Sequence, residues 1–90
     1  MVRAKLIVMN EKGIHLGPAN IIANLADKFD SQIHFKTEYM DVNAKSIINL
    51  ISGTFRQGDI IECICSGPDE KKALKAMRDV LSKDLEEVQP

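Results

Sequence analysis

A histidine stands directly before a predicted helix start in residues 13–20, which read GIHLGPAN. Pro18 suits the first turn of a helix, because its missing N–H costs nothing there and its φ angle is already helical. The start of a helix gathers N–H groups without intrahelical acceptors and the positive end of the helix dipole, so it attracts anions. An imidazole at this place could carry a phosphoryl group into an anion site. The plainer alternative is that His15 only caps the helix or packs at the edge of the loop.

A serine takes a similar position before a second, shorter predicted helix. Residues 43–46, NAKS, lead into the apolar run 47–51, IINLI. Ser46 can serve as the N-cap of this helix, since its hydroxyl oxygen can accept a hydrogen bond from an N–H of the first turn. That capping role alone would justify a serine at this position.

The run 47–51 is more apolar than a short helix can bury on one side. We expect Leu50 and Ile47 to lie in the core. The surplus predicts an exposed apolar patch on which partner proteins dock, because large exposed apolar areas mark interaction sites. The residues assigned to this patch are Ile48, Ile51 and Leu16.

The elements that must position these residues follow from the hydrophobic periodicity. Predicted strands cover residues 2–9, 31–37, 39–42 and 59–66, and predicted helices cover 16–28, 47–51 and 69–85. This order, β-α-β-β-α-β-α with a hairpin in the middle, favours an α+β open-faced sandwich. We expect a four-stranded antiparallel sheet with three helices on one face, and frayed residues at 86–90.

Each predicted strand has one apolar face, and the last helix has one apolar stripe. The two cysteines lie two residues apart on one strand face, where they splay apart, so we expect buried thiols rather than a disulfide or a zinc site. His34 is out of phase with its apolar neighbours and is expected at the surface. The expected core residues are Ala4, Leu6, Val8, Ile33, Phe35, Ile61, Cys63, Cys65, Ala73, Leu74, Met77, Val80 and Leu81.

Length and composition exclude several classes of protein. Ninety residues are expected to form one domain, residues 1–90. There is no apolar run of the roughly 20 residues that a membrane helix needs, and no secretory leader is expected, which predicts a cytoplasmic protein. A net charge of −1, three Phe, one Tyr and no Trp argue against nucleic acid as the main partner. No metal-ligand cluster or nucleotide loop suggests a cofactor or a self-standing enzyme.

Four segments, taken together, resemble the HPr family, the histidine-containing phosphocarrier proteins of the bacterial sugar phosphotransferase system. They are residues 13–19 around the histidine, 43–48 around the serine, the pair 57–58 before the last strand, and 67–70 before the last helix. One short motif would be weak evidence. These four stand in register without gaps and span essentially the whole chain.

The resemblance implies a phosphoryl carrier, which is a protein substrate of other enzymes. Enzyme I, charged by phosphoenolpyruvate, would phosphorylate His15 on the ring Nδ1, and the group would pass to an enzyme IIA domain. Backbone N–H groups of Leu16 and Gly17 would bind the phosphate at the helix start. The resemblance also makes Ser46 a regulatory site for an HPr kinase/phosphorylase, which would place charge in the docking patch without unfolding the helix. The implied partner surface comprises Leu16, Asn20, Ile47, Ile48 and Ile51.

The chain departs from the family pattern at position 17. The family has His-x-Arg-Pro, whereas residues 15–18 read HLGP. The missing arginine would offer a guanidinium to the phosphate and to acidic partner residues, and Lys12 and Lys45 are the nearest basic candidates. Either Gly17 weakens transfer while its N–H still binds phosphate, or the protein has moved towards a regulatory branch. Asn20, where the family prefers a small apolar residue, either tunes recognition or is a tolerated exposed residue.

Three functions therefore stay open. The leading one is a monomeric phosphocarrier in sugar transport. The second is a regulatory HPr-like protein that acts through the phosphorylation state of Ser46 or His15. The third is an α+β interaction module without phosphotransfer, which would leave the joint presence of His15, Pro18 and Ser46 unexplained.

Overall fold

The computed structural model describes residues 1–83, which form four strands and three helices. The order of the elements is the predicted β-α-β-β-α-β-α. None of the helices in this described part is long and apolar enough to cross a membrane. In chain order the elements are β1 (Val2–Ile7), α1 (Leu16–Ala26), β2 (Gln32–Lys36), β3 (Asp41–Asn43), α2 (Ile47–Ser52), β4 (Ile60–Ser66) and α3 (Glu70–Leu81).

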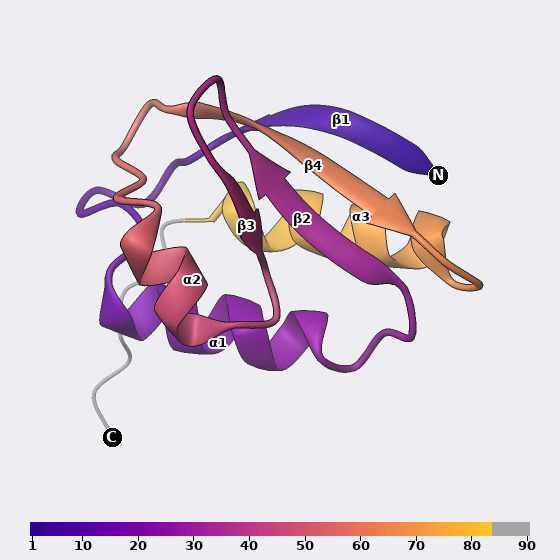
Figure 1. The fold of residues 1–90 in the computed structure, drawn as a ribbon. Helices are drawn as coiled ribbons and strands as arrows, with labels where there is room; N and C mark the ends of the chain where they lie inside the picture. Colours follow the sequence, from indigo (N-terminus) through magenta and orange to yellow (C-terminus); the bar gives the residue numbers. More distant parts are fainter. Residues whose placement is uncertain (84–90) are drawn as a thin grey trace.

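The strands form one antiparallel sheet in the order β1-β4-β2-β3. The helices lie on one side of this sheet (Figure 1). The predicted open-faced α+β sandwich is therefore confirmed. β1 pairs with β4 from Val2 opposite Cys65 to Ile7 opposite Ile60. This pairing brings the end of β1, which leads to His15, beside the segment that enters β4.

The first strand is shorter than predicted. β1 ends at Ile7 rather than at residue 9. Val8 leaves the ladder and bonds to the turn before β4 instead: its N–H donates to Asp59 (2.9 Å) and its carbonyl oxygen accepts from Gly58 (2.8 Å). These bonds tie the loop that leads to α1 to the loop that leads to β4.

Other boundaries differ because local turns compete with the regular elements. β3 begins at Asp41 rather than at 39, because residues 37–40 form a turn closed by the N–H of Thr37 on the carbonyl of Met40 (2.8 Å). α1 ends at Ala26 rather than at 28, where the chain tightens into i→i+3 bonds. α3 ends at Leu81 rather than at 85. Residues 84 and 85, and the predicted frayed end 86–90, lie outside the described residues.

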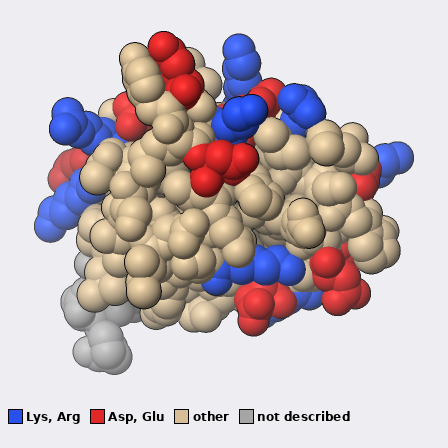
Figure 2. All heavy atoms as spheres, in the orientation of Figure 1, with Lys and Arg blue, Asp and Glu red and all other residues tan. Residues whose placement is uncertain are grey.

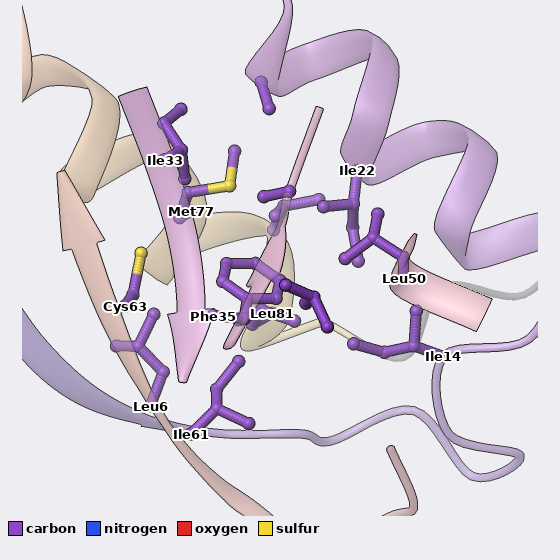
Figure 3. Packing of buried hydrophobic residues seen from close by; sticks show 14 of the residues in the cluster. Leu6, Ile14, Ile22, Ile33, Phe35, Leu50, Ile61, Cys63, Met77 and Leu81 are labelled. Atoms are coloured by element: carbon purple, nitrogen blue, oxygen red, sulfur yellow. The ribbon is translucent and has the colours of Figure 1, made fainter. Parts of the chain in front are cut away.

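The core lies between the sheet and the helices (Figure 3). The inward strand faces are confirmed, since the five residues predicted on β2 and β4 are fully buried. Ala4 and Leu74, which were also predicted in the core, are only half-buried at the margin of the core. Phe35 packs edge-on against Phe55, with ring centroids 6.3 Å apart. Phe55 was not expected in the core, and it anchors the loop between α2 and β4.

The two cysteines are buried free thiols on the inner face of β4, as predicted. Their Sγ atoms lie 3.9 Å apart without a bridge. Burial raises the pKa of both thiols, so the reactive thiolate is disfavoured. His34 is partly exposed, as expected, and its Nδ1 lies 2.8 Å from Asp41 Oδ1.

Asp69 joins the start of α3 to the start of β2. Its carboxylate accepts hydrogen bonds from the Ser31 hydroxyl (2.5 Å), the Ser31 N–H (2.9 Å) and the Asp30 N–H (3.0 Å). The Ser31 hydroxyl first, and then the Asp30 N–H, hold the pKa of Asp69 below its ordinary value. The ionised form of this carboxyl group is therefore the one that the folded chain prefers.

Asp69→Asn is expected to make the free energy of unfolding depend less on pH in the acid range. The folded-state pKa is depressed, so the carboxylate contributes stability that is present above about pH 4 and is lost as the pH falls through the folded pKa. The variant should be less stable than wild type at pH 7 and should lose less on going to pH 3. Urea unfolding at the two pH values measures this, with the exposed Glu38→Gln as control; parallel pH profiles of Asp69→Asn and wild type would contradict it.

Candidate functional site

His15 is the residue immediately before α1. Its backbone is extended (φ −94°, ψ −165°), and its carbonyl oxygen accepts the first helical hydrogen bond from Ala19 (2.8 Å). The imidazole is half-buried, and in the described part of the chain it makes no capping hydrogen bond to the N–H groups of α1. His15 is therefore the N-cap residue of α1, as the plainer alternative expected, but its backbone and not its ring makes the cap.

The first turn of α1 follows His15 directly in the chain. Leu16 and Gly17 begin the helix; the side chain of Leu16 is 66% exposed and Gly17 is half-buried. The N–H groups of a first turn have no intrahelical acceptor. The structure therefore brings together His15 and the N–H groups that the sequence assigned to a phosphate. The helix is held in place by its inner face, which buries Pro18, Ala19, Ile22, Ala23 and Ala26.

Asn10 fixes the loop that ends at the histidine. Its side chain is 7% exposed, and its Nδ2 donates to the carbonyl of Gly13 (2.7 Å), whose own N–H donates back to the Asn10 carbonyl (2.9 Å). Gly13 has a φ of +72°, a region that favours glycine. This role of Asn10 was not predicted from the sequence. The available signal was an asparagine three residues before a glycine.

The loop between α2 and β4 packs against the same segment. The N–H of Ile14 donates to the carbonyl of Phe55 (3.0 Å). A Cβ on Gly13 would overlap that carbonyl oxygen and would lie 3.0 Å from the Cα of Arg56. The two backbones therefore touch one residue before His15. Arg56 is a second residue near the site that the sequence analysis did not single out.

Ser46 is the N-cap of α2, as predicted. Its backbone is extended, and its hydroxyl oxygen accepts hydrogen bonds from the backbone N–H of Asn49 (3.2 Å) and from the Asn49 side-chain amide (3.1 Å). A phosphate on this hydroxyl would stand at the helix start, where the dipole tolerates negative charge.

Ser46→Ala is expected to destabilise the protein by about 1 kcal/mol, because the first turn of α2 loses its capping acceptor. For a domain of this size the melting temperature should fall by about 4–8 °C. Ser52→Ala makes the same change at the other end of α2 and should leave the melting temperature unchanged. Thermal unfolding followed by circular dichroism measures both; equal melting of the two variants would contradict the capping role.

The predicted apolar patch is exposed. The exposed fractions of Leu16, Ile48 and Ile51 are 66%, 77% and 39%, whereas Leu50 is fully buried and Ile47 is half-buried. The two helices that carry these residues, α1 and α2, pack side by side. Figure 2 shows an uncharged area over α2, with charged side chains at its margins. Asn20 is also exposed, on α1.

Lys45 does not lie near His15, contrary to its selection as a candidate cation. Its Nζ donates to the carbonyl of Phe29 (2.6 Å), which follows the C-terminal end of α1. A helix of this length separates its ends by about 16 Å. Lys12, the other candidate, is exposed in the turn before Gly13. Among residues 1–83 there is no group of three His, Cys, Asp or Glu that could hold a metal ion.

Comparisons with known proteins agree on one family. A family model described as "PTS HPr component phosphorylation site" matches residues 2–83. The chain is 40% identical over 84 residues to phosphocarrier protein HPr of Mycoplasma pneumoniae, covering 92% of this chain and 96% of that protein. It is similar to the crystal structure of an HPr from Thermoanaerobacter tengcongensis, with a TM-score of 0.90, 34% identity, and coverage of 98% and 100%.

The chain is also similar to Crh of Bacillus subtilis, described as a catabolite repression protein that forms a swapped dimer in the crystal. The TM-score is 0.75 and the identity 29%, and the match covers 99% of this chain and 100% of that one.

Proposed function

This chain belongs to the HPr family of phosphocarrier proteins, and on that premise we propose that His15 accepts a phosphoryl group from Enzyme I and passes it to an enzyme IIA domain of the phosphotransferase system. The observation that carries the proposal is the position of the imidazole, directly before the first turn of α1 and outside the capping of that helix. A group transferred to the ring would meet the N–H groups of the helix start.

The proposed step is an in-line displacement at phosphorus. An unprotonated nitrogen of the His15 imidazole attacks, a P–N bond forms, and the bond that joins phosphorus to Enzyme I breaks. The N–H groups of Leu16 and Gly17 stabilise the negative charge on the equatorial oxygens by donating hydrogen bonds to them. The same step, with the enzyme IIA domain as acceptor, removes the group from His15.

The proposed partner surface comprises the apolar patch of Leu16, Ile48 and Ile51 together with Asn20 and Ile47. Its core is uncharged and exposed, which is typical of the centre of a protein interface. A partner that covers it also excludes water from the transferring phosphate.

We propose that the chain acts as a monomeric single domain in the cytoplasm and needs no cofactor of its own.

Labelling tests the proposal directly. The wild-type chain is incubated with Enzyme I and radiolabelled phosphoenolpyruvate, beside an active HPr as positive control. One acid-labile phosphate per chain, located at His15 by peptide mapping, is expected. Addition of an enzyme IIA domain should then remove the label. A labelled control together with an unlabelled chain would overturn the proposal.

A regulatory role is the alternative, favoured by the similarity to Crh and by the position of Ser46 at the start of α2, two residues before Ile48 of the patch. In that case an HPr kinase/phosphorylase with ATP labels wild type but not Ser46→Ala. Label at Ser46 without label at His15 would favour regulation over carriage.

A further inference from the structure

A phosphoryl group on His15 carries about two negative charges, and residues 15–18 offer it no cation. Guanidinium groups suit this partner best, because their N–H fork matches two phosphate oxygens. Lys45 is bound to the carbonyl of Phe29 near the far end of α1. The loop between α2 and β4 packs on the segment before the histidine and carries an arginine, Arg56.

This loop is held tightly to the rest of the fold. The side chain of Phe55 is 4% exposed and packs on Phe35, and the Phe55 carbonyl accepts from Ile14. Next to it, Arg56 and Asp59 exchange two bonds: Asp59 Oδ2 accepts from the N–H of Arg56 (2.8 Å), and the N–H of Asp59 donates to the Arg56 carbonyl (3.0 Å). The two hydrogen bonds to Asp59 on one side, and the packing of Phe55 on the other, hold the backbone of Arg56 beside Gly13.

The backbone of Arg56 lies close enough to His15 for its guanidinium and a phosphoryl group on the imidazole to meet, each side chain covering part of the gap. Its Cα lies 3.0 Å from where a Cβ on Gly13 would be, and the two residues from Gly13 to His15 span at most about 7 Å. An extended arginine covers roughly 6 Å from Cα to the guanidinium carbon. The side chain is exposed, and within residues 1–83 it takes part in none of the ion pairs. The carboxylate of Asp59 is directed to the backbone N–H of Arg56 instead.

We propose that Arg56 is the residue whose guanidinium contacts the phosphoryl group on His15, from a loop that the fold places beside the histidine. This role rests on the proposed phosphorylation of His15 and names the cation that accompanies it. It accounts for a glycine at position 17, because the charge comes from another part of the chain.

A test that needs no partner protein uses phosphoramidate, which phosphorylates histidine chemically. The ³¹P resonance of phosphorylated wild type, Arg56→Gln and Arg3→Gln is followed against pH. A nearby guanidinium favours the dianionic phosphoryl group. We therefore expect the midpoint of its second ionisation to rise by about half a pH unit or more in Arg56→Gln and to stay at the wild-type value in Arg3→Gln. Circular dichroism verifies that each variant is folded.

The second test measures the rate of transfer from Enzyme I. Arg56→Gln is expected to lower kcat/KM by about tenfold or more, and Arg56→Lys by less. Gly17→Arg in the Arg56→Gln background should restore the rate, since it places a guanidinium on the other side of the same phosphate. A general loss of folding would not be rescued in this way, and Arg3→Gln, which removes the same charge elsewhere and should transfer at the wild-type rate, controls for net charge.

The outcomes separate the two proposals. An unshifted ³¹P midpoint and a wild-type transfer rate in Arg56→Gln would overturn the role of Arg56 while leaving phosphorylation of His15 intact. A shifted midpoint in Lys12→Gln instead of Arg56→Gln would assign the contact to Lys12 and also overturn it. Absence of labelling by Enzyme I would contradict the proposed function, whereas the phosphoramidate experiment would still decide on Arg56.

Discussion

His15→Ala is expected to abolish uptake of phosphate from Enzyme I, a loss on the order of 10³-fold or more. The size of the effect follows from the chemistry, because alanine removes the nitrogen that forms the P–N bond and neighbouring groups cannot replace it. Folding should be preserved, since the imidazole does not cap α1 and the backbone of residue 15 still accepts the first helical hydrogen bond. Labelling with Enzyme I and phosphoenolpyruvate, followed by gel autoradiography, measures the loss.

The matched control is His34→Ala. His34 is the other histidine of the chain, on β2, with its ring 2.8 Å from Asp41 Oδ1. This variant should take up label at the wild-type rate. If His15→Ala kept an acid-labile phosphate, or if His34→Ala lost it, the nucleophile would have to be reassigned.

Ile48→Glu should weaken binding to Enzyme I by about 30- to 1000-fold, which corresponds to roughly 2–4 kcal/mol. Ile48 is 77% exposed in the free protein, so the unfolding free energy of the domain should change little. In the proposed complex Enzyme I covers Ile48, and a buried carboxylate without a partner is costly there. Isothermal titration calorimetry and thermal unfolding, run on the same sample, separate binding from folding.

Ile60→Glu is the control for this prediction. Ile60 is 60% exposed, and it alternates with the buried residues of β4, so it lies on the face of the sheet away from the helices. The same change of charge there should leave binding unaffected. Equal weakening by both substitutions would point to a general charge effect, and unfolding of Ile48→Glu would place the residue in the core.

The fold was largely predictable from local patterns. Ile33 and Phe35 alternate with polar residues along β2, and Ile61 with its two neighbouring cysteine positions does the same along β4, so the buried face of each strand could be assigned without a structure. The ends of the elements were not predictable in the same way. Turn contacts such as the Thr37 to Met40 hydrogen bond decide where β3 begins, and these depend on side chains and geometry that periodicity does not encode.

The site was predicted in part. His15 and the helix that follows it, Ser46 as a cap, and the exposed isoleucines of α2 all follow from short stretches of sequence. Lys45, one of the two candidate cations, does not serve His15, because sequence alone does not give the direction of a long flexible side chain. Its Nζ is bound to a carbonyl beyond the far end of α1.

The sequence by itself determined the order of the elements, their buried faces, and the histidine and serine at two helix starts, because helix caps and hydrophobic periodicity act over a few residues. Only the tertiary structure decided which distant residues pack against the segment before His15. The pairing of β1 with β4 brings the loop containing Arg56 onto Gly13, and the buried ring of Phe55 holds it there. Such contacts join residues far apart in the chain, so they arise only once the sheet has closed and the core has packed.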